Sequence, residues 1–249
     1  MLNYHGLLSS ALQSGEKSRF SVTEANFLDH LQRIAATGCS ACSLKQICDG
    51  RKSNVLAITF DDGRASDYEV AFPLLIQAGF AGDFFINPTT IGHKGYLSWA
   101  QAKEMHRAGM SVQSHGHEHV DHSQLDAAEL KRQLAESKRT IEDHLGSEVE
   151  FFAAPYGEWN RELVEAAQEA GYRAVCITAG QLANPAAKVI DRICIDAATS
   201  TADLAAILAR DPGFFAAREL KYRVKRFPKA MALKLFPEAV NAWRERHHE

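Results

Sequence analysis

The densest group of metal-binding residue types is a run of histidines in the segment SHGHEH, residues 114–119. His122 follows, so four of the chain's eleven histidines fall within eight residues. On a helical turn, residues four apart share a face, so His115 and His119 can bind one metal ion while His117 points elsewhere. We predict a metal site here, and the alternative is a solvated polar loop.

Two adjacent carboxylates stand in the segment TFDDG, residues 59–63. Neighbouring side chains on a continuing strand point in opposite directions. Asp61 and Asp62 can therefore face one site only if the strand ends there and Gly63 turns the chain. If a divalent cation binds one carboxylate, the other can stay ionised beside it as a general base. The alternative is that both residues cap a turn.

Two imidazole nitrogens and one carboxylate oxygen form a ligand set with open positions, which is typical of catalytic metal sites. Zn²⁺ suits these ligands best, and Ni²⁺, Co²⁺ or Mn²⁺ could occupy the same set. Such a metal lowers the pKa of a bound water to about 7. The predicted chemistry is therefore hydrolysis.

Apolar runs alternate with amphipathic stretches along the chain, which indicates a parallel sheet with crossover helices. These elements must position the candidate residues. About seven such units favour a barrel or a doubly wound sheet, in which reactive residues lie at the carboxyl ends of the strands. The predicted strands are residues 2–4, 55–60, 82–87, 110–114, 150–155, 172–178 and 189–195, and the predicted helices are residues 25–36, 66–78, 98–107, 126–145 and 160–170.

Two local patterns give more specific predictions. Residues 66–69 read Ser-Asp-Tyr-Glu, which predicts a capping box at the start of the second helix, and Pro73 should kink that helix. Cys39 and Cys42 form a CxxC pair within a predicted short strand, where residues three apart point to opposite faces. We therefore expect structural cysteines, although a thiol site or zinc knuckle is the alternative.

Composition limits the class of protein. The 249 residues are 46% hydrophobic, which fits one large domain, and the net charge of -3 argues against a nucleic-acid partner. The five cysteines are odd in number and fit a reducing compartment. The first residues show no signal peptide, and no run approaches the roughly 20 apolar residues of a membrane span. A cytoplasmic location is expected.

Three ordered motifs resemble those of the polysaccharide deacetylase family, also called the NodB homology domain or carbohydrate esterase family 4. They are TFDDG, SHGHEH and FAAPYG, at residues 59–63, 114–119 and 152–157. Residues 3–5, Asn-Tyr-His, with Phe27 and Leu31, resemble the N-terminal extension of members tied to exopolysaccharide synthesis. The likeness runs over residues 2–210 and implies a distorted parallel β/α barrel.

The resemblance also implies roles for individual residues. It makes Asp61 the general base and completes the metal ligands as Asp62, His115 and His119. It places Pro155, Tyr156 and Gly157 along the substrate groove, with the backbone N–H of Tyr156 directed at the oxyanion. The implied partner is an acetylated amino-sugar glycan.

This sequence departs from the family pattern at two places. Ala153 stands where the third motif often has an arginine that contacts the base, and no histidine lies between His144 and His247 to serve as the usual late general acid. We hypothesise that His5 is the acid, with an exposed or structural histidine as the alternative. Arg192 is the candidate to replace that arginine and orient Asp61. We also expect Arg192 among the substrate-binding residues.

The C-terminal stretch differs in character from the rest. We predict a catalytic domain over residues 1–210 and a basic amphipathic helical extension over residues 211–249. Residues 218–246 hold nine Lys or Arg against three acidic residues. Two interpretations stay open, which are peripheral contact with the anionic inner membrane surface and a solvated helical face.

The function that agrees with all these features is metal-dependent N-deacetylation of an amino-sugar glycan in exopolysaccharide or cell-surface polysaccharide metabolism. The same site could hydrolyse another amide or an O-acetyl ester. A catalytically silent glycan-binding module is the competing class, and a structural partner of a polysaccharide-synthesis complex is a third.

Overall fold

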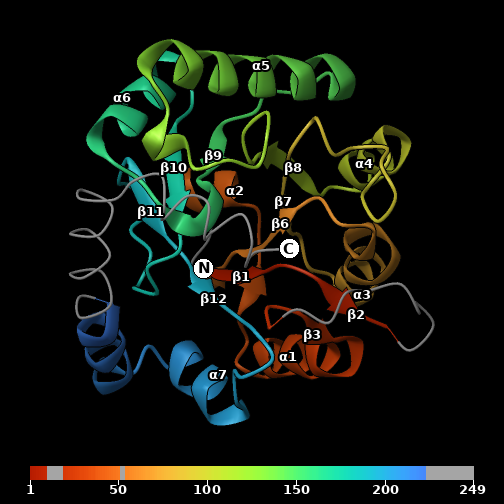
Figure 1. Cartoon of the computed structure of the whole chain (residues 1–249). Coiled ribbons are helices and arrows are strands. Elements are labelled where there is room, and N and C mark those ends of the chain that lie inside the picture. Colours follow the sequence, from red (N-terminus) through yellow and green to blue (C-terminus); the bar gives the residue numbers. More distant parts are fainter. Residues whose placement is uncertain (10–18, 51–53, 223–249) are drawn as a thin grey trace.

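Eight parallel strands form the centre of the computed structural model, which describes residues 1–9, 19–50 and 54–222 (Figure 1). Their order across the sheet is β11-β10-β9-β8-β7-β6-β1-β12. The strands are β1 (Leu2–Tyr4), β6 (Ile58–Asp62), β7 (Asp83–Ile86), β8 (Ser111–Ser114), β9 (Phe151–Ala153), β10 (Ala174–Ile177), β11 (Val189–Asp191) and β12 (Ile193–Cys194).

One stretch of chain joins the two edges of this sheet. The run predicted as a single strand over residues 189–195 is divided at Arg192 into β11 and β12. β11 pairs with β10 at one edge, and β12 pairs with β1 at the other. The sheet therefore curls into a nearly closed barrel, and the prediction of a distorted parallel β/α barrel is confirmed.

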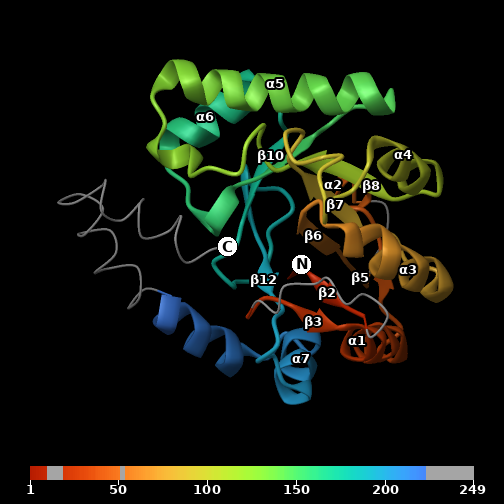
Figure 2. The ribbon, with the colours of Figure 1, turned by 45° about the vertical axis from the view of Figure 1, so that its right-hand side comes forward.

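Helices surround the barrel, with α5 and α6 on one side and α1 and α7 on the opposite side (Figures 1 and 2). They are α1 (Glu24–Ala36), α3 (Phe72–Ala78), α4 (Trp99–Arg107), α5 (Ala127–Leu145), α6 (Arg161–Glu169) and α7 (Thr201–Leu208). The longest, α5, begins where the Asp126 carboxylate accepts the N–H groups of Ala128 and Glu129, and it ends at Gly146. These limits match the prediction for residues 126–145.

An inner core fills the barrel. It consists of Leu44, Phe85, Phe151, Ala153, Ala174, Cys176 and Ile190. Leu44 comes from a short helix, α2 (Leu44–Cys48), and its backbone N–H donates to the buried carboxylate of Asp83. Ion pairs from Lys45 to Glu150 and from Arg173 to Asp49, both 2.6 Å, hold α2 against the barrel.

The predicted capping box at Ser66 does not form. Ser66 has helical backbone angles and no side-chain cap, and its Oγ instead accepts the N–H of Leu7 at 3.2 Å. A π-helix, η1 (Asp67–Ala71), follows, and regular α3 begins only at Phe72. Helical backbone angles continue through Ala71 and Phe72 into Pro73, so the irregularity predicted for this helix takes the form of a π-helical turn just before the proline.

The predicted strand around the cysteine pair is shorter than expected. β4 (Ser40–Ala41) pairs with β5 (Val55–Leu56) beside the barrel, and Cys39 and Cys42 flank β4. All five cysteines are free thiols, and Cys42 is buried. The predicted run of residues 55–60 is divided between β5 and β6. A further pair of short strands, β2 (Leu7–Leu8) and β3 (Val22–Thr23), packs next to α1.

The C-terminal prediction can be followed only in part. Residues 212–222 form a helix, whereas residues 223–249, which carry most of the predicted basic extension and membrane contact, lie outside the described residues. None of the helices in the described ranges combines the length and apolarity needed to cross a membrane.

Candidate metal centre and active site

The predicted ligands follow two strands that flank β7. Asp61 and Asp62 end β6, and His115 follows β8 directly, with His119 in the next loop. Because β6, β7 and β8 run parallel, the carboxyl ends of β6 and β8 lie at the same end of the barrel. Residues separated by more than fifty positions in sequence therefore meet there.

Asp62, His115 and His119 form a compact cluster. The Asp62 Oδ1 atom lies 3.5 Å from His115 Nε2 and 3.4 Å from His119 Nε2, and the three ligand atoms lie within 4.8 Å of one another. Oδ1 is buried and has no hydrogen-bond partner among the described residues. A buried, unpaired carboxylate oxygen facing two imidazole nitrogens is costly without a cation. The donor set therefore fits a divalent metal.

The backbone of Asp62 explains how adjacent carboxylates reach one site. Strand pairing runs through Asp62, which is opposite Ile86, and the strand ends there, with Gly63 turning the chain at a φ of 68° as expected. Asp62 itself also adopts a left-handed φ of 80°. Left-handed backbone costs a non-glycine residue roughly 1–2 kcal/mol. Here the left-handed conformation turns the Asp62 side chain away from the direction that strand alternation would give it.

Hydrogen bonding fixes the orientation of His115. Its ring is buried, and its Nδ1–H donates to the carbonyl oxygen of Ala153 at 2.8 Å. This tautomer leaves Nε2 free of hydrogen and directed at Asp62, the arrangement usual for a metal-bound histidine. Ala153 thus contributes its backbone carbonyl to the site.

His119 is held by the predicted groove motif. The Tyr156 ring meets His119 edge-on at 4.8 Å, and the Tyr156 hydroxyl donates to the His119 carbonyl at 3.4 Å. Burial lowers the pKa of His119 to about 4, so the ring is neutral near pH 7, as a metal ligand must be. Tyr156 therefore borders the cluster, and Pro155 and Gly157 flank Tyr156 in the same short 3-10 helix.

The other two histidines of the run face elsewhere, as expected for His117. Its Nε2 lies 3.8 Å from a carboxylate oxygen of Glu136 on α5. His122 is buried against Phe152 and donates from Nδ1 to the Val120 carbonyl at 2.8 Å. Both side chains support the loop, while His115 and His119 face the cluster.

Asp61 forms a two-pronged ion pair with a buried arginine. Arg192 donates from Nη1 to Oδ1 at 2.7 Å and from Nη2 to Oδ2 at 2.8 Å, and Asn3 adds a third donor to Oδ2 at 2.9 Å. Burial alone would raise the pKa of Asp61, but the charges of Arg192, His115 and His5, with the Arg192 hydrogen bonds, together outweigh it and lower that pKa. Arg192 has no exposed surface, so its position fits orientation of Asp61 and not contact with a substrate.

Sequence reasoning missed the donors that assist at this end of the barrel. Asn3 reaches Asp61 because β1 pairs with β6 and places Asn3 opposite Thr59. Arg64 donates to the second oxygen of Asp62, Oδ2, from Nε and Nη2, both at 3.4 Å. The signal for Arg64 was its position directly after TFDDG, whereas Asn3 required the strand order.

His5 lies near the cluster, at the end of β1. Its ring stacks on Phe20 with centroids 5.1 Å apart, and the Arg19 guanidinium lies 4.5 Å above Phe20. His5 Nδ1 is buried without a hydrogen-bond partner in the described part of the chain. Burial would raise the pKa of Asp62, but His115, His119 and His5 together hold it well below the ordinary value. His5 therefore lies within electrostatic range of the cluster.

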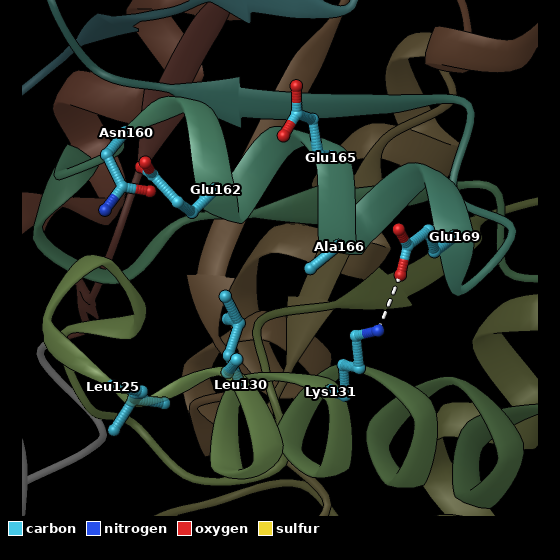
Figure 3. Close-up of a pocket in the computed structure, with 9 residues that line it drawn as sticks. Leu125, Leu130, Lys131, Asn160, Glu162, Glu165, Ala166 and Glu169 are labelled. Atoms are coloured by element: carbon cyan, nitrogen blue, oxygen red, sulfur yellow. Dashed lines mark ion pairs between the residues drawn. The ribbon is translucent and has the colours of Figure 1, made fainter.

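A hollow elsewhere on the molecule is separate from this cluster. It lies between α5 and α6, holds about 250 Å³, and is bordered by Leu130, Ala166 and the ion pair of Lys131 with Glu169 at 2.9 Å (Figure 3). None of the predicted site residues lines it. The chemistry of the chain is therefore concentrated at the carboxyl ends of the strands.

The fold resembles solved structures. A Streptococcus pyogenes deacetylase, PplD, solved with acetate, has a TM-score of 0.76 at 23% identity and covers 82% of this chain and 95% of its own. IcaB from Ammonifex degensii has a TM-score of 0.70 at 24% identity, over 84% of this chain and 94% of its own. At these identities the likeness shows the fold alone.

Sequence comparisons bear on the family. The Bacillus subtilis (strain 168) protein named "Putative polysaccharide deacetylase YxkH" is 28% identical over 173 residues, or 67% of this chain and 61% of that protein. A chitin deacetylase from Pestalotiopsis sp. is 27% identical over 122 residues, or 49% of this chain and 41% of that protein. The chain thus spans less than two thirds of these relatives. The family model described as polysaccharide deacetylase matches residues 49–175, just over half of the 249 residues. The protein belongs to the polysaccharide deacetylase family.

Proposed function

We propose that this protein is a metal-dependent hydrolase that removes N-acetyl groups from an amino-sugar-containing glycan, in exopolysaccharide or cell-surface polysaccharide metabolism. The observation that carries the proposal is the pairing of two sites at one end of the barrel. Asp62 Oδ1 faces two histidine nitrogens, and beside it Asp61 is held by Arg192.

Asp62, His115 and His119 would hold the metal, for which Zn²⁺ suits the donor set best. When bound, such a metal activates water and polarises the acyl oxygen. Asp61 is ionised at neutral pH because Arg192 lowers its pKa. Each oxygen of a carboxylate has two lone pairs, so Asp61 can accept a proton from the attacking water while Arg192 and Asn3 hold it.

The remaining groups act on the carbonyl and the leaving amine. Tyr156 has a left-handed φ of 61°, and we infer that this turn directs its N–H at the oxyanion. Water oxygen bonds to the acyl carbon, the carbon–nitrogen bond breaks, and the amine nitrogen takes a proton. We assign that proton to His5, whose ring is fixed by Phe20 at the same end of the barrel. The products are acetate and a free amino sugar.

The names of similar proteins support an acetylated glycan as substrate. One relative is named a chitin deacetylase, and PplD, whose fold this chain shares, is described in complex with acetate. An intact, arginine-oriented Asp61 favours turnover over a silent binding module, because metal binding alone needs only Asp62 and the two histidines.

Bound metal and acetate release from N-acetylglucosamine oligomers, measured together, test the proposal. Asp61→Asn should keep the metal and lose at least about a hundredfold in turnover, because the amide cannot accept the proton. Glu162→Gln, which also replaces a carboxylate with an amide but at an exposed position of α6, should leave metal content and turnover unchanged. An O-acetylated oligomer run in parallel separates amide from ester hydrolysis. Absence of both metal and acetate in wild type would contradict the proposal.

A further inference from the structure

We propose that Arg64 is a positioning residue that keeps Asp62 a one-oxygen metal ligand. The inference rests on the metal site of the proposed function and adds a residue to it. Arg64 follows Gly63 directly, at the point where the chain leaves β6.

The two oxygens of Asp62 have different partners. Oδ1 faces His115 Nε2 and His119 Nε2, whereas Oδ2 accepts Nε–H and Nη2–H of Arg64, both at 3.4 Å. A carboxylate can bind a cation through one oxygen or through both. A guanidinium on the second oxygen competes with the cation for that oxygen, and so favours binding through Oδ1 alone.

The position of Arg64 is fixed from the opposite loop. Arg64 and Tyr96 form an antiparallel bridge, and the guanidinium carbon lies 5.3 Å from the centroid of the Tyr96 ring. On either side, Ala65 donates to Gly95 and the Leu97 N–H donates to Gly63, both at 2.9 Å. The arginine is thus held by paired backbone and by an aromatic face while its side chain is 39% exposed.

Single-oxygen binding has a chemical consequence. Three ligand atoms leave positions open for water and for the acyl oxygen, and a fourth protein atom would occupy one of them. Loss of Arg64 frees Oδ2 and also removes a positive charge from beside the cation. Both changes favour the metal, so a variant without Arg64 should bind metal at least as tightly as wild type but turn over more slowly.

Cobalt(II) loading tests this, because visible absorption of Co²⁺ weakens as its number of ligands increases. We compare wild type, Arg64→Met and Arg64→Lys, with Arg107→Met at an exposed position of α4 as the matched control. Arg64→Met should show at least about a twofold weaker absorption, an unchanged or lower Kd by chelator competition, and roughly tenfold slower deacetylation. Arg64→Lys retains a donor for Oδ2, so its absorption, Kd and turnover should lie nearer those of wild type. Arg107→Met should equal wild type in all three.

The outcomes are distinguishable. An Arg64→Met protein with the wild-type cobalt spectrum overturns the proposal, whether its turnover falls or not. Weaker metal binding with an unchanged spectrum assigns Arg64 a purely structural role and also overturns it. If Arg64→Met does not fold by circular dichroism, Arg64→Gln takes its place under the same criteria. A wild-type protein that binds no cobalt overturns both this inference and the proposed function.

Discussion

At the scale of single residues, local spacing was enough to predict the metal cluster but not its supports. His115 and His119 lie four apart, and Asp62 belongs to a five-residue motif, so their types and spacing carried the signal. Arg192 was predicted as a partner of Asp61, and the structure adds that it is buried and forked onto both oxygens. Asn3 and Arg64 were missed because their contacts depend on strand register and on a loop bridge.

Gly157 allows a prediction at this scale. Gly157 and Gly146 share a φ of 68°, but an added Cβ at Gly157 would lie 3.1 Å from the Thr178 nitrogen, whereas Gly146 has open space within 4 Å. Gly146→Ala should cost about 1 kcal/mol of unfolding free energy, from the backbone alone. Gly157→Ala should cost roughly 2–4 kcal/mol, because crowding adds to strain.

Urea denaturation measures the difference between these two variants. Turnover gives an independent measure, since a displaced Gly157 moves Tyr156 away from His119, whereas Gly146 ends a distant helix. Gly157→Ala should therefore also lose deacetylation, and Gly146→Ala should retain it. Equal stabilities of the two variants would show that the close approach to Thr178 does not matter.

At the scale of elements, α2 and the start of the helix after Ser66 were the hardest to predict from the sequence. A helix of five residues is too short to give a periodic signal, and α2 was not predicted. The capping box at Ser66 failed for a related reason. Ser66 Oγ is used by Leu7, a contact between segments nearly sixty residues apart that no local pattern reports.

Asp83 connects α2 to the barrel and should make stability depend on pH. Burial raises the pKa of Asp83 from 3.8 to about 7, although its Oδ2 accepts the Leu44 N–H. A carboxyl whose pKa is higher in the folded state stabilises below its unfolded pKa and loses that effect as pH rises. Its contribution to stability should therefore fall between about pH 4 and pH 7.

Asp83→Asn isolates this contribution, because the amide keeps an acceptor for Leu44 and cannot ionise. The unfolding free energy of the variant should exceed that of wild type by up to about 4 kcal/mol at pH 8, and the difference should vanish near pH 4. Denaturation of both proteins across this range measures it, with all other titrating groups in common. A difference that is constant with pH would contradict the assigned pKa.

At the scale of the whole molecule, metal binding should stabilise the fold. The cluster joins β6 to the loop after β8, and the unfolded chain does not hold these ligands together. Zn²⁺ at a hundred times its Kd should add about 2.7 kcal/mol to the unfolding free energy. Thermal unfolding with Zn²⁺ and with a chelator checks this, and His119→Ala should remove the difference. An equal shift in His119→Ala would place the bound metal elsewhere.

Most strands and helices of the barrel could be predicted, because the spacing of apolar residues differs between strands and helices and is visible in the sequence. The closure of the barrel could not, since the division of residues 189–195 at Arg192 depends on two separate edges meeting there. The domain division at residue 210, the membrane contact and the cytoplasmic location stay predictions.

This closure has a consequence in time as well as in space. Arg192 lies between the two strands that bring the edges together, so Asp61 gains its partner only when β12 has paired with β1, at far separation in sequence. Such non-local pairing is slow to form during folding. The metal ligands, with Ala153 and Tyr156 that orient them, need only β6 to β9 and the turn after β9. A refolding chain should therefore capture its metal first and recover turnover later, so that enzymatic activity reports the last step of barrel assembly.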